Sequence, residues 1–305
     1  MNALPLTRIA LGNGIELDVV DVGPRDAPAL IFLHGFPESH RTWRHQIAHL
    51  AGRFRCIAPD QRGYRGSSKP VGVEHYAPAK MIGDVFRLAD ALGVERFTVI
   101  GHDWGGAIAW GVALTGQPGA AAAGRVTRAI IANAPHPAIF PRLLWTSPVQ
   151  RRASQYFRTF RDPAIDADLA AHGLAPLLAR VLPGPASSRM EPEERAALLA
   201  DWADPAAALA MISWYRASPV MVPPLDAPYA LPDSFLALPV PPLTVPTLVI
   251  WGMDDHALPP ENLAGLDQHI TDLSLVRIPD CGHFVPWEAP DAVNAGIDAF
   301  LATAD

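Results

Sequence analysis

The stretch VIGHDWGG, residues 99–106, joins an apolar run to a helix-like segment of small residues. Its glycines allow a strand and the next helix to approach closely, and the sharp turn between them would expose the central side chain. Such a turn, the nucleophile elbow, carries serine in the motif Gly-x-Ser-x-Gly, but here the central residue is Asp103. An attacking carboxylate leaves an alkyl ester, so we expect a substrate with an electrophilic sp3 carbon. The competing interpretation is an ordinary turn with a solvated aspartate.

Length and composition narrow the class of protein. The 305 residues are half apolar, enough for one large domain or for a core domain with an inserted one. The net charge of −7 comes without a long basic run, which disfavours nucleic acid as a partner. Cys56 and Cys281 form no Cys-x-x-Cys pair, so we expect a reduced protein without a structural metal. We find no uncharged apolar span of membrane length and expect a cytoplasmic protein.

Apolar runs and helical patterns alternate in the first part of the chain. We expect strands at 16–20, 29–33, 55–58, 97–100 and 126–132 and helices at 42–50, 76–92 and after residue 103. This alternation predicts an α/β protein with a mostly parallel, doubly wound sheet and right-handed crossovers.

The strand pattern stops after about residue 135. Helical stretches follow at 144–160, 164–172, 191–202 and 205–216, which we interpret as an inserted helical cap. A proline-rich return segment, 219–246, leads to strands at 248–251 and 273–278 and to a helix at 291–301. The expected division is therefore a core of residues 1–135 and 243–305 with a cap of residues 136–242.

A carboxylate nucleophile needs a base to activate water against its ester, and an acid to orient that base. Two later loops, each after an expected strand, offer these groups: one carries Asp254 and Asp255, the other His283. Position at the carboxyl edge of the sheet distinguishes His283 among eleven histidines. Asp255 is favoured over Asp254, for which the alternative is a solvated neighbour.

The motif HGFP, residues 34–37, ends the apolar run at 29–33. In a hydrolase of this layout, the backbone N–H of Phe36 would face a developing oxyanion. The alternative interpretation is a simple Gly-Pro turn.

Four motifs follow one another along the chain: HGFPES at 34–39, WRHQ at 43–46, GHDWGG at 101–106 and DCGH at 280–283. Together they resemble the epoxide hydrolases of the α/β-hydrolase fold. The resemblance spans nearly the whole chain and is thinnest in the middle of the cap. It implies the α/β-hydrolase fold with an inserted helical cap.

The resemblance also implies two cap tyrosines that point down at the nucleophile. Tyr215, in SWYR at 213–216, matches one of them, although an ordinary helix aromatic is its alternative role. Tyr156, in QYFRTFRDP at 155–163, matches the other. The segment NAPHP at 133–137 has no acidic residue where the nearest relatives carry one, which leaves Asp255 as the acid of the triad.

The implied reaction is hydrolysis of an apolar epoxide to a vicinal diol through an ester on Asp103. In this scheme Tyr156 and Tyr215 donate to the epoxide oxygen, and His283, oriented by Asp255, activates water. The scheme needs no metal and no cofactor. Its partners are a small apolar epoxide and water, without nucleic acid or membrane, and a homodimer is left open.

The same scheme assigns the remaining site residues. The backbone N–H groups of Phe36 and Trp104 would hold the oxyanion. Phe36, Pro37, Trp104 and the two tyrosines are the expected substrate-binding residues. Six apolar side chains of the cap indicate a largely apolar substrate. They are Phe140, Trp145, Phe157, Phe160, Met211 and Met221.

Three other functions share parts of this pattern. A haloalkane dehalogenase also uses an aspartate elbow followed by tryptophan, but the two cap tyrosines argue against it. A haloacetate dehalogenase would be expected to carry arginine where Trp104 stands. A non-catalytic small-molecule receptor on this fold would usually keep a serine elbow.

Overall fold

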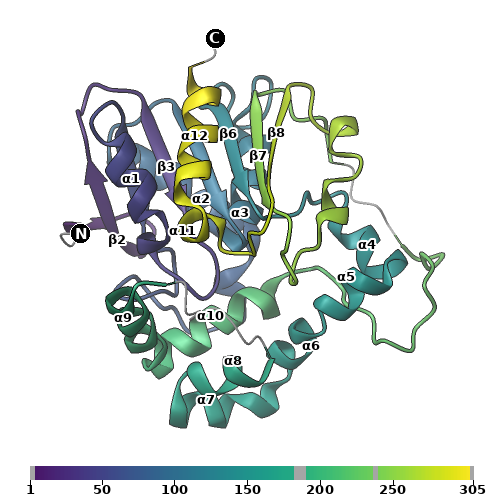
Figure 1. Cartoon of the computed structure of the whole chain (residues 1–305). Helices are drawn as coiled ribbons and strands as arrows, with labels where there is room; N and C mark the ends of the chain where they lie inside the picture. Colours follow the sequence, from purple (N-terminus) through teal and green to yellow (C-terminus); the bar gives the residue numbers. More distant parts are fainter. Residues whose placement is uncertain (1–3, 182–189, 236–239, 303–305) are drawn as a thin grey trace.

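The computed structural model describes residues 4–181, 190–235 and 240–302. An eight-stranded sheet forms its centre, with helices on both faces (Figure 1). The strands lie in the order β1-β2-β4-β3-β5-β6-β7-β8. β1 and β2 are antiparallel, as are β2 and β4, and all other neighbours are parallel. The strand bounds are β1 Leu6–Ala10, β2 Glu16–Val22, β3 Ala29–Leu33, β4 Arg55–Pro59, β5 Phe97–His102, β6 Val126–Ala132, β7 Thr247–Gly252 and β8 Leu273–Ile278.

The central strands are buried on both faces. Side chains of a strand point alternately to opposite faces, and β3 shows this directly. Its Ile31 and Leu33 belong to the apolar cluster that includes α2 (Pro78–Ala91) and α3 (Trp104–Gly116), whereas Leu30 and Phe32 belong to the cluster of the opposite face. The second face is covered by α1 (Arg44–Leu50), α11 (Val285–Glu288) and α12 (Pro290–Leu301). The predicted mostly parallel α/β sheet is confirmed.

Two parts of the core differ from the sequence-based expectation. β1 was not expected, because its side chains are mostly exposed and give no buried apolar run. The helix expected at 76–92 begins only at Pro78, after a short 3-10 helix at Val73–Tyr76. Proline at the first helical position fits because no hydrogen bond is lost there.

The segment between β6 and β7 holds the second group of helices, which lie together beyond one end of the sheet in Figure 1. They are α4 Phe140–Thr146, α5 Pro148–Ala153, α6 Tyr156–Arg161, α7 Asp166–His172, α8 Ala175–Val181, α9 Pro192–Trp202 and α10 Pro205–Ala217. The single helix expected at 144–160 is wrong, since α4, α5 and α6 replace it. Pro148 cannot continue α4, and Ser147 caps α5 by accepting hydrogen bonds from two backbone N–H groups.

Part of the proline-rich return segment, residues 236–239, lies outside the described residues. Within the described ranges, no single helix has the length and apolar character needed to cross a membrane. The bent pair α9 and α10, at 85° to each other, meets those two criteria only when both helices are combined.

Candidate active site

Asp103 occupies the turn between β5 and α3. Its φ is +52°, a conformation that non-glycine residues rarely adopt and that concentrates at functional sites. The flanking glycines make the turn sterically feasible. A Cβ on Gly105 would collide with the backbone carbonyl of Leu33, and one on Gly101 with the carbonyl of Gly105. The sequence therefore places Asp103 on a strained corner at the carboxyl end of β5.

The two carboxylate oxygens of Asp103 have different partners. Oδ1 accepts a 2.7 Å hydrogen bond from the backbone N–H of Phe36, and the backbone of Trp104 also donates to the carboxylate. Oδ2 lies 3.5 Å from Nε2 of His283. Burial alone would raise the pKa of Asp103, but the hydrogen bond and charge of His283, with a contribution from His102, lower it below the ordinary value. The carboxylate is therefore ionised at neutral pH.

His283 stands between two carboxylates. Its Nδ1 lies 2.7 Å from Oδ2 of Asp255, opposite the contact with Asp103. Burial would lower the pKa of His283, but the charge of Asp255 and the hydrogen bonds with both carboxylates hold it well above its ordinary range. The structure thus brings the three residues together, while the alternative acid, Asp254, is exposed.

Asp255 is fixed by donors on both oxygens. Oδ1 accepts hydrogen bonds of 2.8 Å from the backbone N–H groups of Ala257 and Leu258. Oδ2 accepts a 2.7 Å bond from the side-chain amide of Asn133, whose own oxygen accepts from the backbone of Gly252. The sequence analysis missed this role of Asn133. The signal that the sequence offered for this role was the position of Asn133 directly after β6. Its backbone has a φ of +38°, which asparagine tolerates better than most residues.

His102 and Glu38 form a second buried pair beside His283, and the sequence analysis did not predict this pair either. Nε2 of His102 lies 2.8 Å from the backbone carbonyl of His283, and its Nδ1 is 3.5 Å from Oε2 of Glu38. Trp287 donates its indole N–H to the other oxygen of Glu38 at 2.7 Å. Both residues stood inside the recognised motifs, HGFPES and GHDWGG, but those motifs gave no indication of their contact.

The two tyrosines come from separate helices, Tyr156 from α6 and Tyr215 from α10. Their ring centroids are 5.8 Å apart, and Tyr215 also packs edge-on against Trp104 and Phe36, at 5.1 and 5.0 Å. Burial, followed by neighbouring negative charge including that of Asp103, raises the pKa of both phenols well above the ordinary value. Both phenols therefore keep their protons as hydrogen-bond donors.

An apolar cavity of about 630 Å³ opens beside Asp103. Asp103, Trp104 and Tyr156 line it, and Phe140 and Phe157 supply apolar wall. Phe36, Pro37 and Tyr215 are not among its lining residues. Of the other expected apolar side chains, Trp145 and Met221 line a neighbouring cavity of about 830 Å³, and Phe160 and Met211 line neither. In the described ranges, no cluster of three metal-ligating side chains was found.

The family profile of the alpha/beta hydrolase fold matches residues 28–290. A solved structure described among novel epoxide hydrolases of the alpha/beta hydrolases superfamily, from metagenomes of hot environments, is 64% identical, with a TM-score of 0.95 over 99% of this chain and 100% of that one. The inhibitor complex of a Bacillus megaterium epoxide hydrolase is 29% identical, with a TM-score of 0.83 over 98% and 100%. The AB hydrolase superfamily protein YfhM of Bacillus subtilis is 32% identical over 95% of each chain.

Proposed function

Because this chain belongs to the alpha/beta hydrolase family, we propose that it is an epoxide hydrolase that opens an apolar epoxide through an ester on Asp103. The observation that carries the proposal is the setting of this carboxylate. One oxygen is held by the backbone N–H of Phe36, the other faces His283, and the phenol of Tyr156 lines the same cavity. The solved structure at 64% identity, from a study of epoxide hydrolases, supports the same activity.

In the first half-reaction, Oδ2 of Asp103 attacks one carbon of the epoxide and displaces the ring oxygen. A new C–O bond forms to the carboxylate as the ring C–O bond breaks. The developing alkoxide is a poor leaving group in water, so it needs a proton or strong hydrogen bonds as it forms. Tyr156 and Tyr215 supply them, because their raised pKa values keep the phenols protonated.

In the second half-reaction, water attacks the carbonyl carbon of the ester. His283 accepts a proton from this water, and Asp255 stabilises the resulting imidazolium. The oxyanion forms on Oδ1, which already accepts a hydrogen bond from Phe36 and lies next to the backbone N–H of Trp104. Its collapse breaks the C–O bond to the substrate, and His283 returns its proton to the departing alkoxide. The diol is released and the carboxylate of Asp103 is restored.

Ester formation prepares this base. While Asp103 is charged, it helps to keep His283 protonated. The ester removes that charge and leaves Asp255 as the single carboxylate in contact with the imidazole. The pKa of His283 therefore falls at the step that next requires a neutral base.

The proposed cap, residues 136–242, supplies Tyr156, Tyr215 and the apolar walls of the cavity. An assay with styrene oxide, 1-bromobutane and fluoroacetate tests the proposal. Diol formation without halide or fluoride release is the expected result. Halide release would favour a dehalogenase, and no turnover of any of the three compounds would favour a receptor.

A further inference from the structure

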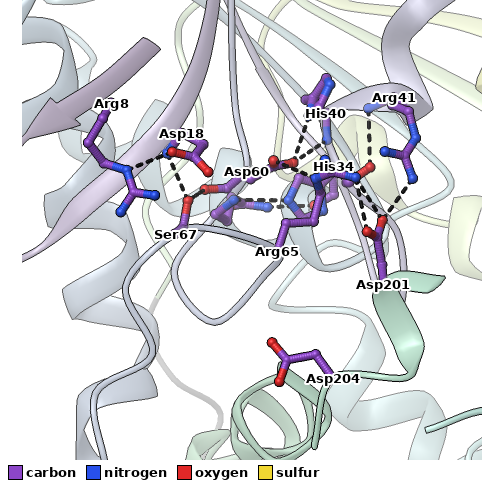
Figure 2. A network of polar contacts seen from close by, with 12 residues as sticks. Arg8, Asp18, His34, His40, Arg41, Asp60, Arg65, Ser67, Asp201 and Asp204 are labelled. Carbon is purple, nitrogen blue, oxygen red and sulfur yellow. Dashed lines mark hydrogen bonds and ion pairs between the residues drawn. The ribbon is translucent and has the colours of Figure 1, made fainter. Parts of the chain in front are cut away.

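Asp60 lies directly after β4 and is fully buried. Its Oδ1 accepts hydrogen bonds from the backbone N–H of His40 at 2.9 Å and lies 2.8 Å from Nδ1 of the same residue. Its Oδ2 lies 3.0 Å from Nε of Arg65 (Figure 2). Burial would raise the pKa of Asp60, but contacts with His40 and the charge of Arg65 hold it below the ordinary value. A buried carboxylate therefore anchors Arg65 from the core side.

Arg65 has an unusual backbone. Its φ is +46°, in the left-handed region that glycine adopts without steric conflict and that arginine rarely does. Its loop is held in place by hydrogen bonds, including one from the backbone N–H of Ser67 to the carbonyl of Tyr64 at 3.0 Å. Strain of this kind persists only where the surrounding structure holds the backbone in place, and it is concentrated at functional sites.

The guanidinium of Arg65 reaches from the core to α9. Its Nη1 donates to both carboxylate oxygens of Asp201 at 3.0 Å, and Nη2 of Arg41 donates to Asp201 at 2.8 Å. Arg41 also lies 3.2 Å from Glu194, on the same helix. Two core arginines thus hold one carboxylate of the cap, as Figure 2 shows. We call Arg41, Arg65 and Asp201 the cap clamp.

Two further hydrogen bonds near the cap clamp join the cap to core segments close to the proposed catalytic residues. Trp202, adjacent to Asp201, donates its indole N–H to the carbonyl of Pro37 at 2.7 Å. In α10, Trp214 donates to the carbonyl of Arg62 at 3.0 Å, and the next residue is Tyr215. The loop that carries Arg65 is therefore bonded to both α9 and α10.

The same loop also supports the donor loop at 34–37. The backbone N–H of Gln61 donates to Nε2 of His34 at 3.0 Å, and the side-chain amide of Gln61 donates to the carbonyl of His34 at 2.6 Å. His34 stands two residues before Phe36, whose N–H binds Asp103. One loop of the core is thus bonded to the segment that precedes Phe36 and to the helix that carries Tyr215.

We propose that Arg65 is a positioning residue, whose strained backbone and ion pair with Asp201 hold α9 and α10 so that Tyr215 keeps its packing against Phe36 and Trp104, beside Asp103. The proposal rests on the function proposed above. It assigns the cap clamp to ester formation, which uses Tyr215. The groups of ester hydrolysis, namely Asp103, His283, Asp255 and the backbone N–H of Phe36, all belong to the core.

Two substitutions test this inference. Arg65→Gly removes the guanidinium and relieves the left-handed backbone, so a loss of function cannot be attributed to new backbone strain. Asp201→Asn keeps the shape of the side chain and removes its charge. Arg8→Gln is the matched control, because Arg8 pairs with Asp18 at 2.7 Å near the same loop without contacting the cap (Figure 2).

Single-turnover kinetics with styrene oxide separate the two half-reactions. In Arg65→Gly and in Asp201→Asn, we expect ester formation to slow by about 10- to 100-fold, the scale of effect of misplacing a reacting group. Ester hydrolysis should stay within about twofold of the wild-type rate. The effects of the two substitutions together should be less than additive, because each removes the ion pair between Arg65 and Asp201. Arg8→Gln should leave both rates unchanged. Unchanged ester formation in both variants, or equal slowing of both half-reactions, would overturn the proposal.

Amide hydrogen exchange supplies a readout that does not depend on turnover. Protection of residues 205–217 should fall in Arg65→Gly and Asp201→Asn and should not change in Arg8→Gln. If the wild-type protein opens no epoxide but this pattern appears, the proposed function fails and the structural role of the clamp holds. Wild-type protection in both variants would contradict the clamp even in an active enzyme.

Discussion

The backbone N–H of Phe36 donates a 2.7 Å hydrogen bond to Oδ1 of Asp103, and this bond makes the two oxygens of one carboxylate unequal. In the proposed mechanism, Oδ1 already occupies the place where negative charge develops when the ester is hydrolysed. Oδ2, on the side of His283, remains available to attack carbon. The proposed nucleophile of the first half-reaction and the proposed oxyanion of the second are therefore two atoms of the same side chain.

Asp103→Ala should eliminate turnover, because it removes the carboxylate that forms the proposed ester. The decisive measurement is one turnover of excess wild-type enzyme in water labelled with oxygen-18. The diol should take its new oxygen from the carboxylate of Asp103, so the first diol released is unlabelled. Labelled first-turnover diol would show direct attack by water, and near-native activity in Asp103→Ala would lead to the same conclusion.

His283→Gln should trap the ester. Glutamine cannot accept the proton from water, whereas Asp103 and both phenols remain in place. Mass spectrometry should detect the added mass of the epoxide on the peptide that contains Asp103. A variant that turns over at the wild-type rate without accumulating this adduct would exclude His283 as the base.

Removing the phenol hydroxyls should slow ester formation. We expect Tyr156→Phe and Tyr215→Phe each to reduce its rate by about 10- to 100-fold, and the double variant by about 10³-fold or more, because each removes a positioned donor. Ester hydrolysis should change far less. Single-turnover rates are the measurement, and a double variant with wild-type ester formation would remove the tyrosines from the mechanism.

The two half-reactions should respond differently to pH. The pKa of Asp103 lies below its ordinary value and those of Tyr156 and Tyr215 lie well above theirs, so ester formation should be flat between about pH 5 and 9. Hydrolysis needs neutral His283 and should slow as pH falls through the pKa of that residue in the ester. The raised pKa of His283 also contributes to the folding stability of the free enzyme. This contribution is complete below the pKa of histidine in the unfolded chain, and it is lost as pH rises through the pKa of His283 in the folded protein. Matching pH profiles for both steps would contradict this assignment.

Asn133→Gly should weaken the support of Asp255. Glycine accepts the positive φ, so the main loss is the hydrogen bond to a buried carboxylate, worth about 1.5–3 kcal/mol of unfolding free energy. Ester hydrolysis should slow, since the orientation of His283 depends on Asp255. Chemical denaturation and the rate of ester breakdown are the measurements. Wild-type values for both would show that the amide of Asn133 is dispensable.

The sequence predicted the buried parts of the fold best. Parallel strands covered on both faces, such as β3 and β6, give continuous apolar runs, and their positions were found closely. β1 escaped notice because it is an exposed edge strand, and Ser147 and Pro148 divide a helical pattern that seemed continuous by periodicity alone. The local sequence pattern does not show whether an edge strand is covered by other parts of the protein.

The candidate site shows the same limit. Asp103, Asp255 and His283 follow strands, so the shared carboxyl edge of a parallel sheet predicts that they meet. The contacts of Asn133 with Asp255 and of Asp201 with Arg65 join residues far apart in the chain. No local pattern records such pairs, because they depend on how the sheet orders its strands and how the helices rest on it. The catalytic roles of the site residues and the division at 135 and 242 remain predictions.

β6 and β7 are neighbours in the sheet, although residues 133–246 separate them in the chain. Because these two strands are parallel, the insertion leaves the sheet at the carboxyl end of β6 and rejoins it at the amino end of β7. A chimera that takes this segment from a relative would keep the eight strands and Asp103, while exchanging both phenols and the part of the cavity wall that the insertion supplies. We expect such an exchange to alter substrate preference in one step, provided that the new segment also pairs with the loop around Arg65.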